Sequence, residues 1–285
     1  MTRTSHRFAA PSGLSLAVHD WGGDGPPVLL AHPTGFHGVV WQPVAERLVQ
    51  RNRRVWSFDF RGHGDSDPSP HRTYAWSEFA DDADAVLDHL GLRADSDLLA
   101  VGHSKGGASL LTVAARDASA LPRVWAYEPI VFPSHDPFPV DADNPMSAAA
   151  RRRRGVWPSR ADARASYASK PPLDSLSDEA LTAYVDYGTR DLDDGTVELK
   201  CRPEDEASMY AMGATNGLFD RLREVTCPVR ILCGATSQSI PPAFGARLVE
   251  RLPHATLEVW DGRGHFGPLE DPDRAVDSIL DFAAA

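Results

Sequence analysis

Cysteine is scarce in this chain: Cys201, Cys227 and Cys233 are the only three among 285 residues. Their number is odd and their spacing matches no metal-binding pattern, which argues against a disulfide scaffold and against a cysteine-based zinc site. We expect small buried thiols, a usage typical of proteins kept in a reducing compartment.

Long hydrophobic runs and an excess of positive charge are also missing. No apolar segment approaches the roughly 18 residues that a membrane-spanning helix needs, and the N-terminus lacks the apolar core of a secretion signal. The net charge of −11 argues against nucleic acid or an anionic membrane surface as the main partner. The one basic run, residues 151–154, is predicted to be the exposed face of a helix. These absences predict a cytoplasmic protein without a nucleic-acid or membrane partner.

Short apolar runs alternate with amphipathic stretches along most of the chain. Strands that alternate with helices predict a mostly parallel, doubly wound α/β sheet. Between residues 133 and 225 the strand-like runs vanish, while prolines and charges become more frequent. We therefore expect an α/β core of residues 1–132 and 226–285 with a helical lid inserted at residues 133–225. The expected strands are residues 14–21, 27–31, 54–59, 98–101, 123–127, 228–234 and 256–260. The expected core helices are residues 41–50, 76–90, 108–115 and 271–282.

The sequence Gly-His-Ser-Lys-Gly at residues 102–106 follows one of these strands and opens a helix. This context is typical of a nucleophile elbow, in which the serine occupies a strained position in a tight turn. Gly102 and Gly106 are needed there because a Cβ at either position would collide with the turn. The free N–H groups and positive dipole end of the helix would face Ser104, where negative charge develops during acyl transfer. Ser104 is therefore the predicted nucleophile.

A serine hydroxyl needs a base that takes its proton and an acid that orients the base. Among the 11 histidines, His265 is the candidate base, because it follows a strand, lies in a glycine-flanked loop and comes after the serine in the chain. His103 adjoins Ser104 but points away from it, and His32 is expected to make structural hydrogen bonds. The polar loop of residues 59–66 is predicted to be a structural turn.

Four motifs together resemble the α/β-hydrolase-fold superfamily with a lid. They are residues 32–35, 59–66, 102–107 and 264–266, which span nearly the whole chain apart from the lid. The resemblance places the family's nucleophile and base on the serine and histidine named above. It also implies two backbone N–H donors for the oxyanion, at Lys105 and Thr34. Gly35 and Phe36 are the alternatives to Thr34.

The acid of the triad departs from the common family pattern. In most relatives it is an Asp three residues after the Gly that ends the next-to-last strand, and here that place holds Ser237. Glu128 ends the strand that follows the elbow helix, where a minority of relatives, some lactone hydrolases among them, carry their acid. We therefore predict Glu128 as the acid. Asp261 is the other carboxylate considered, but it lies too close to His265 in sequence to align easily with the far ring nitrogen.

These features predict a serine hydrolase that cleaves a carboxylic ester or lactone through an acyl-serine, without a metal or an organic cofactor. Superfamily members that cleave carbon–halogen bonds or epoxides carry Asp at the nucleophile position, so Ser104 argues against both activities. Thioesterase, carbon–carbon bond hydrolase and perhydrolase activities use the same triad and stay open, as does a ligand-binding or signalling role on a hydrolase scaffold. A homodimer is compatible with the sequence. The side chains expected to line the substrate pocket are Phe36, Trp157, Tyr184, Met209 and Phe266.

Overall fold

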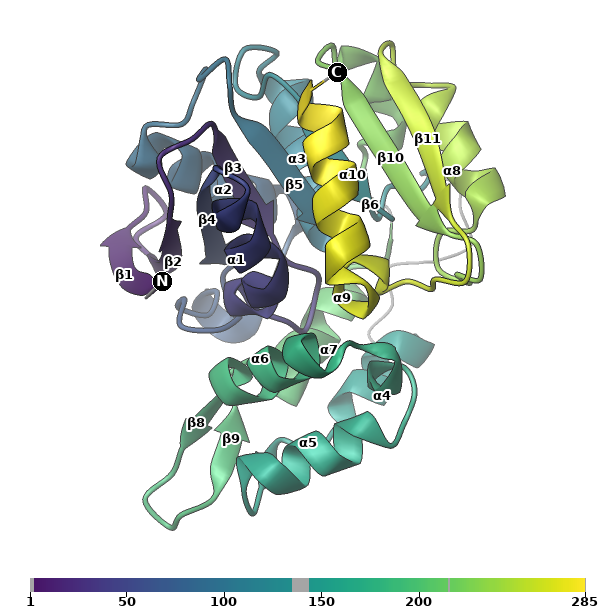
Figure 1. Ribbon diagram of the computed structural model, residues 1–285. Coiled ribbons are helices and arrows are strands. Elements are labelled where there is room, and N and C mark those ends of the chain that lie inside the picture. The colour runs from purple at the N-terminus through teal and green to yellow at the C-terminus, as the bar shows by residue number, and fades with distance from the viewer. Residues whose placement is uncertain (1–2, 135–143, 215, 285) are drawn as a thin grey trace.

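The computed structural model describes residues 3–134, 144–214 and 216–284. Its centre is an eight-stranded sheet with the order β1-β2-β4-β3-β5-β6-β10-β11 (Figure 1). β2 pairs antiparallel with β1 and with β4, and all other neighbours are parallel. The predicted mostly parallel α/β sheet is thus confirmed. The strands are β1 (Thr4–Ala9), β2 (Ser15–Gly22), β3 (Pro27–Ala31), β4 (Arg54–Asp59), β5 (Leu99–His103), β6 (Val124–Tyr127), β10 (Val229–Gly234) and β11 (Ala255–Trp260).

The central strands are apolar because both of their faces are covered. Every residue of β5 is buried, and so is every residue of β3 after Pro27. The two strands pair in parallel, with Leu30 opposite Val101. Strand β1 lies at the edge of the sheet and is mostly exposed, so its polar sequence does not mark it as a strand.

Helices cover both faces of the sheet (Figure 1). α1 and α10 pack against each other on one face, over a hydrophobic cluster that includes Trp125 and Ile279. α2, α3 and α8 cover the other face, where a second cluster includes Phe79 and Leu111. In the described ranges, no helix is long and apolar enough to span a membrane. The core helices are α1 (Gln42–Gln50), α2 (Trp76–Leu90), α3 (Lys105–Arg116), α8 (Pro242–Val249), α9 (Gly267–Glu270) and α10 (Pro272–Ala284), with 3₁₀ helices η1 (Gly38–Trp41), η2 (Pro70–Arg72) and η4 (Phe219–Glu224).

Between β6 and η4 the chain forms an inserted layer of helices beyond the carboxyl ends of the strands, and we keep the name lid for it (Figure 1). The 3₁₀ helix η4, within the expected lid bounds of 133–225, packs against α3 of the core. Helix α6 of this layer packs against η1 of the core. The lid also contains a small antiparallel sheet of order β7-β9-β8, which the sequence does not reveal because strands of two or three residues show no alternating pattern. The lid elements are α4 (Pro145–Arg151), β7 (Val156–Trp157), α5 (Arg160–Ala168), η3 (Leu173–Ser175), α6 (Asp178–Gly188), β8 (Thr189–Asp191), β9 (Val197–Leu199) and α7 (Pro203–Ala211).

The carboxyl ends of the parallel strands meet at the edge of the sheet that faces the lid (Figure 1). The loops that follow β3, β5, β6, β10 and β11 all leave the sheet at this edge. Ligands of open α/β sheets bind in the crevice beyond the carboxyl ends of the strands. The predicted site residues of the core lie in or directly beside these loops.

Candidate active site

Ser104 stands in the turn between β5 and α3 with a strained backbone, at φ 54° and ψ −116°. The flanking glycines are required by close approach of the backbone. A Cβ at Gly102 would lie 2.5 Å from the Gly107 nitrogen, and a Cβ at Gly106 would lie 2.3 Å from the Ala31 carbonyl oxygen. Any larger residue at either position would push these backbone segments apart. The local geometry is that of a nucleophile elbow.

Hydrogen bonds fix the Ser104 backbone from three sides. Its N–H donates to the Tyr127 carbonyl at 2.9 Å, and its carbonyl accepts from the N–H groups of Ala108 at 3.0 Å and Ile130 at 3.3 Å. Ser104 is buried and stands directly before the first turn of α3. The unpaired N–H groups of that turn therefore lie beside the serine, where they favour negative charge.

Glu128 follows β6 directly, has a φ of 44° and is completely buried. Its carboxylate accepts three hydrogen bonds. Oε1 accepts from the Gly234 N–H at 2.9 Å, and Oε2 accepts from Ser237 Oγ at 2.7 Å and from His265 Nδ1 at 2.6 Å. These donors offset the cost of burying the carboxylate. Ser237, which stands at the place of the common acid, is thus a hydrogen-bond partner of Glu128.

His265 lies in the loop between β11 and α9, and its side chain keeps 20% exposure. Since a carboxylate only accepts, Nδ1 carries the hydrogen of the bond to Glu128, and Nε2 of the neutral ring is left as the acceptor. Two further bonds hold the loop in place. His103 Nε2 donates to the His265 carbonyl at 2.7 Å, and the Tyr127 hydroxyl donates to the Gly264 carbonyl at 2.7 Å. His103 therefore supports the position of His265.

The loop after β3 offers backbone N–H groups beside the elbow. The Gly35 N–H is engaged, because it donates to His63 Nε2 at 3.2 Å, and the Phe36 N–H faces the Pro33 carbonyl at 3.4 Å. Over the described part of the chain, the Thr34 N–H has no protein acceptor. Thr34 is accordingly the better candidate donor for an oxyanion, together with the first N–H of α3.

The side chain of Lys105 is a feature that the sequence analysis missed. It is completely buried, and its Nζ lies 3.2 Å from His63 Nε2 and 4.3 and 4.4 Å from the ring centroids of Phe60 and Phe79. Burial lowers the pKa of Lys105 well below its usual value, and burial likewise lowers the pKa of His63. Through His63, Lys105 supports the Gly35 peptide of the loop after β3, which we call the oxyanion loop because it holds the candidate donor Thr34.

Aromatic rings connect the lid to His265. The centroid of Tyr184 lies 4.8 Å from that of Phe36, Phe36 lies 5.3 Å from Phe266, and Phe266 lies 5.2 Å from the His265 ring. On the lid side, Tyr167 lies 5.6 Å from Tyr184 and 5.4 Å from Trp157. We call this series the aromatic row: Trp157, Tyr167, Tyr184, Phe36 and Phe266. It contains four of the five side chains that the sequence predicts for the pocket.

The fifth, Met209, lies elsewhere. It is 2% exposed and belongs to the hydrophobic cluster on the other face of the sheet. Its Cε packs against Gly62, where an added Cβ would lie only 2.7 Å from Met209 Cε. Sequence spacing on helix α7 does not show which face of the helix meets the core, and the burial of Met209 is the reason to expect a packing role for it.

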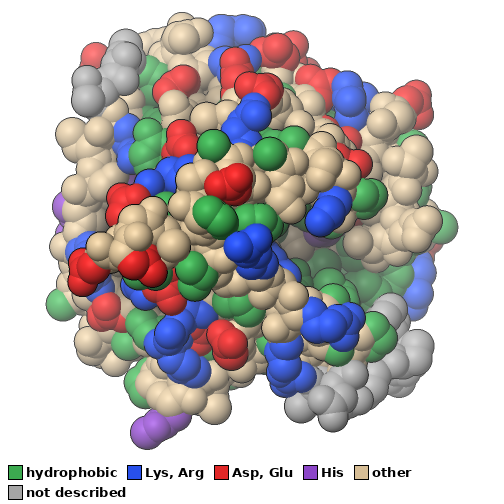
Figure 2. All heavy atoms as spheres, turned by 90° about the horizontal axis from the view of Figure 1, so that it is seen from below, with side chains coloured by type: hydrophobic (Ala, Val, Ile, Leu, Met, Phe, Trp, Pro, Cys, Tyr) green, Lys and Arg blue, Asp and Glu red, His purple; other side chains and the backbone are tan. Residues whose placement is uncertain are grey.

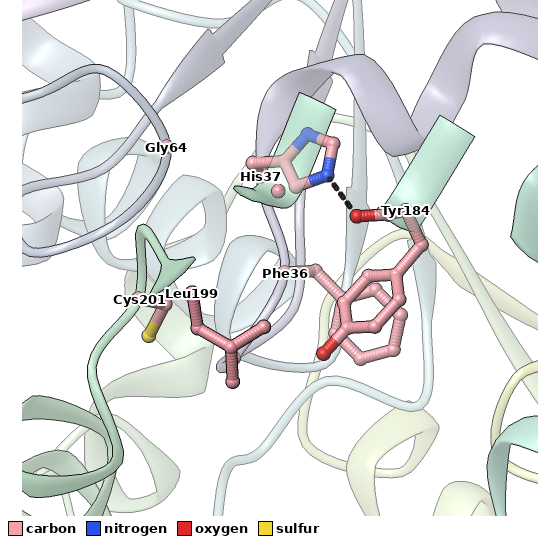
Figure 3. A pocket seen from close by; sticks show the side chains of 8 residues that line it. Phe36, His37, Gly64, Tyr184, Leu199 and Cys201 are labelled. Atoms are coloured by element: carbon pink, nitrogen blue, oxygen red, sulfur yellow. Dashed lines mark hydrogen bonds between the residues drawn. The ribbon is translucent and has the colours of Figure 1, made fainter. Parts of the chain in front are cut away.

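The lid contacts the oxyanion loop at a small cavity of about 10 Å³ beside Phe36 and Tyr184 (Figure 3). His37 Nε2 donates to the Tyr184 carbonyl at 3.1 Å and so connects the start of η1 to α6. Seen from the lid side, the surface shows a hollow with hydrophobic side chains on its wall and Lys or Arg side chains near its rim (Figure 2). In the described segments, no group of three His, Cys, Asp or Glu residues is placed to hold a metal ion.

Comparison with known proteins gives consistent matches along the chain. A model of the alpha/beta hydrolase family matches residues 28–278. The chain is 27% identical over 262 residues to a non-heme chloroperoxidase of Kitasatospora aureofaciens, with 89% of each protein covered. It is 25% identical over 263 residues to the 2-(acetamidomethylene)succinate hydrolase of Mesorhizobium japonicum, with 92% of this chain and 90% of the relative covered. A crystal structure of E-2-(acetamidomethylene)succinate hydrolase matches with a TM-score of 0.84 at 24% identity and covers 100% of both chains.

Proposed function

Because the chain belongs to the alpha/beta hydrolase family, we propose that it is a serine hydrolase that cleaves a carboxylic ester or a lactone. The observation that carries the proposal is the hydrogen bond of 2.6 Å between His265 Nδ1 and Glu128 Oε2, at the same sheet edge as a serine in an elbow. Nucleophile, base and acid thus come from three loops of one sheet edge. This arrangement supports acyl transfer through a covalent intermediate.

In the first half-reaction, Ser104 Oγ attacks the carbonyl carbon of the substrate while its proton moves to His265 Nε2. Glu128 keeps the other ring nitrogen protonated and stabilises the imidazolium that forms. The carbonyl oxygen becomes negative and accepts hydrogen bonds from the N–H groups of Thr34 and Lys105. The bond to the alcohol oxygen then breaks, His265 gives its proton to that oxygen, and an acyl-serine remains.

In the second half-reaction, a water molecule gives a proton to His265 while its oxygen attacks the acyl carbon. The bond to Ser104 Oγ breaks, the serine takes its proton back from His265, and the carboxylic acid leaves. With a lactone the alcohol and the acid stay in one product molecule.

A second candidate is perhydrolysis, favoured by the similarity to a non-heme chloroperoxidase over 89% of the chain. Hydrogen peroxide would then replace water in the second half-reaction and would give a peracid in place of the acid. A third candidate, a ligand-binding protein on a hydrolase scaffold, would be favoured by a missing acid, since the usual acid position holds Ser237. Ser237 instead donates a hydrogen bond to Glu128, which supplies the carboxylate, and this counts against the third candidate.

The test is labelling and turnover at Ser104. A serine-directed phosphonate is expected to modify this residue alone, and Ser104→Ala should lower hydrolysis of a short-chain aryl ester by roughly 10⁴-fold with an unchanged melting temperature. Ser109→Ala is a matched control, since Ser109 is a buried serine of helix α3 whose hydroxyl donates to the Lys105 carbonyl. Labelling at another residue, or near-normal turnover by Ser104→Ala, contradicts the proposal.

A further inference from the structure

One arginine of the lid is turned inward, against the oxyanion loop. Residues 151–154 are four consecutive arginines, and Arg153 is the one among them that is not exposed. The expectation that this run is an exposed face is therefore wrong at Arg153. A Cβ at Gly35 would lie 3.5 Å from Arg153 Nη1 and 2.4 Å from Glu206 Oε1. The guanidinium thus lies next to the loop that carries Thr34.

The contacts of Arg153 leave its charge partly open to a ligand. Nη1 forms an ion pair with Glu206 Oε2, Nη2 donates to the Tyr184 hydroxyl at 2.6 Å, and Nη2 also reaches the Tyr167 hydroxyl at 3.4 Å. The Arg153 side chain keeps 22% exposure, whereas that of Glu206 keeps 7%. A molecule that approaches the pair therefore meets the cation first.

The unused hydrogen-bond capacity around Arg153 consists of donors. A guanidinium carries five N–H groups, and the contacts above occupy only some of them. The hydroxyls of Tyr184 and Tyr167 accept from Arg153, so each keeps its own hydrogen for another acceptor. Within the ranges that the structure describes, neither hydroxyl hydrogen has a protein acceptor. A ligand group that only accepts hydrogen bonds, such as a carboxylate, matches this set.

The arginine is connected to the reacting residues by the aromatic row. Tyr184, which accepts from Arg153, is in ring contact with Phe36, and Phe266 continues the series to the His265 ring. A substrate that lies along these rings with its carbonyl at the elbow would direct its far end toward Arg153. The reacting carbonyl and the group at Arg153 would then lie at opposite ends of such a substrate.

We propose that Arg153 binds a carboxylate carried by the substrate, with the Tyr184 hydroxyl as a second donor. This rests on the proposed hydrolase function and names its substrate class: an ester or lactone with a carboxylate several bonds from the carbonyl that is cleaved. A buried ion pair is by itself weak evidence of a stabilising role, because apolar side chains of similar volume often give equal stability. Glu206 holds one edge of the guanidinium and leaves the rest to the substrate.

The experiment compares a charged and a neutral ester of equal chain length, 4-nitrophenyl hydrogen adipate and 4-nitrophenyl hexanoate. Arg153→Met removes the charge and keeps the methylene packing. It should lower kcat/KM for the adipate ester by roughly 10- to 100-fold, mainly through KM, and should change the hexanoate value by less than about threefold. Arg153→Lys should recover part of the preference. Arg160→Met is the matched control, because Arg160 belongs to an exposed lid ion pair with Asp191 and should leave both esters unaffected.

Equal losses for the two esters in Arg153→Met would overturn the inference, and so would an unchanged adipate value. Binding without turnover separates this outcome from failure of the proposed function. Monomethyl adipate should bind to Ser104→Ala in a calorimetric titration and should bind at least about tenfold more weakly when Arg153→Met is added. Equal affinity in the two backgrounds rejects the carboxylate site. Absence of ester turnover and of phosphonate labelling at Ser104 instead rejects the hydrolase.

Discussion

Replacing Glu128 by Gln tests the acid with the smallest change in shape. The Gly234 N–H lies 2.9 Å from Oε1 and must face an oxygen, so the amide nitrogen of the Gln takes the place of Oε2. There it presents hydrogens to Ser237 Oγ and to His265 Nδ1, which lie 2.7 and 2.6 Å from Oε2 in the wild type. The Ser237 hydroxyl can rotate to accept one of them. His265 can accept only by moving its ring hydrogen to Nε2.

A ring protonated at Nε2 cannot take the proton of Ser104, and the imidazolium has lost its carboxylate. In a serine-protease triad the equivalent change lowers kcat roughly 10⁴-fold, which corresponds to about 5 to 6 kcal/mol of transition-state stabilisation. We expect Glu128→Gln to lower turnover by roughly 10²- to 10⁴-fold. The fold should persist, because a buried neutral amide replaces a buried charge of the same shape.

The assay is the initial rate with a short-chain aryl ester, combined with ¹⁵N NMR of the imidazole to identify the protonated nitrogen. Asp261→Asn is the matched control, since Asp261 is an exposed carboxylate four positions before His265 and should keep turnover within about twofold. If Glu128→Gln keeps more than about a tenth of the wild-type kcat, the assignment of Glu128 as the acid is refuted.

Further substitutions give four more expected outcomes. Ser237→Asp places a second carboxylate beside Glu128, so it should lower wild-type activity and partly restore activity to Glu128→Ala in the same ester assay. Lys105→Met should raise the free energy of unfolding at pH 7 by about 1 to 3 kcal/mol in denaturant unfolding. Burial lowers the pKa of Lys105 in the folded state, so the stability of the wild type falls as pH drops below 10.5. The advantage of the variant should therefore shrink as pH rises toward 10.5. Burial lowers the pKa of His37 to about 4, so stability should fall by about 3 kcal/mol between pH 6.5 and pH 4, and His37→Gln should remove this part of the slope. Trp157→Ala, at the outer end of the aromatic row, should shift the preferred chain length of the ester. Met209→Ala should lower the free energy of unfolding by about 2 to 5 kcal/mol and leave the preferred chain length unchanged. A change of chain length in Met209→Ala alone would contradict a packing role for Met209.

The sheet could be predicted from the sequence where both faces of a strand are covered. Residues 27–31 and 98–101 are continuous apolar runs because helices pack on each side of β3 and β5. The same reasoning fails for β1, whose residues are mostly exposed, and for the lid strands, which are too short to have a period. Burial on two faces thus makes a strand stand out as an apolar run, whereas β11 is found in the sequence although most of its residues are partly exposed.

The residues of the candidate site also differ in how far the sequence reveals them. Ser104 and His265 are marked by backbone requirements, namely glycines that a turn needs, and such requirements are local in sequence. Arg153 pairs with Glu206, which is 53 positions away in the sequence. A run of four arginines gives no sign of which one turns inward. The surroundings of Lys105 come from the loop after β4, with Phe60 and His63, and from Phe79 of helix α2. Roles that depend on side chains distant in sequence need the structure.

Glu128, the proposed acid, also lies where the chain leaves the sheet toward the lid. Its positive φ turns the chain away from the sheet directly after β6, and this chain continues into the lid. The Glu128 N–H donates to the Leu232 carbonyl at 2.8 Å, and two residues later the Ile130 N–H donates to the Ser104 carbonyl at 3.3 Å. A non-glycine residue keeps a strained conformation only where its surroundings fix it. Within three residues, the backbone after β6 therefore fixes Glu128, the proposed acid, against β10 and contacts Ser104, the proposed nucleophile.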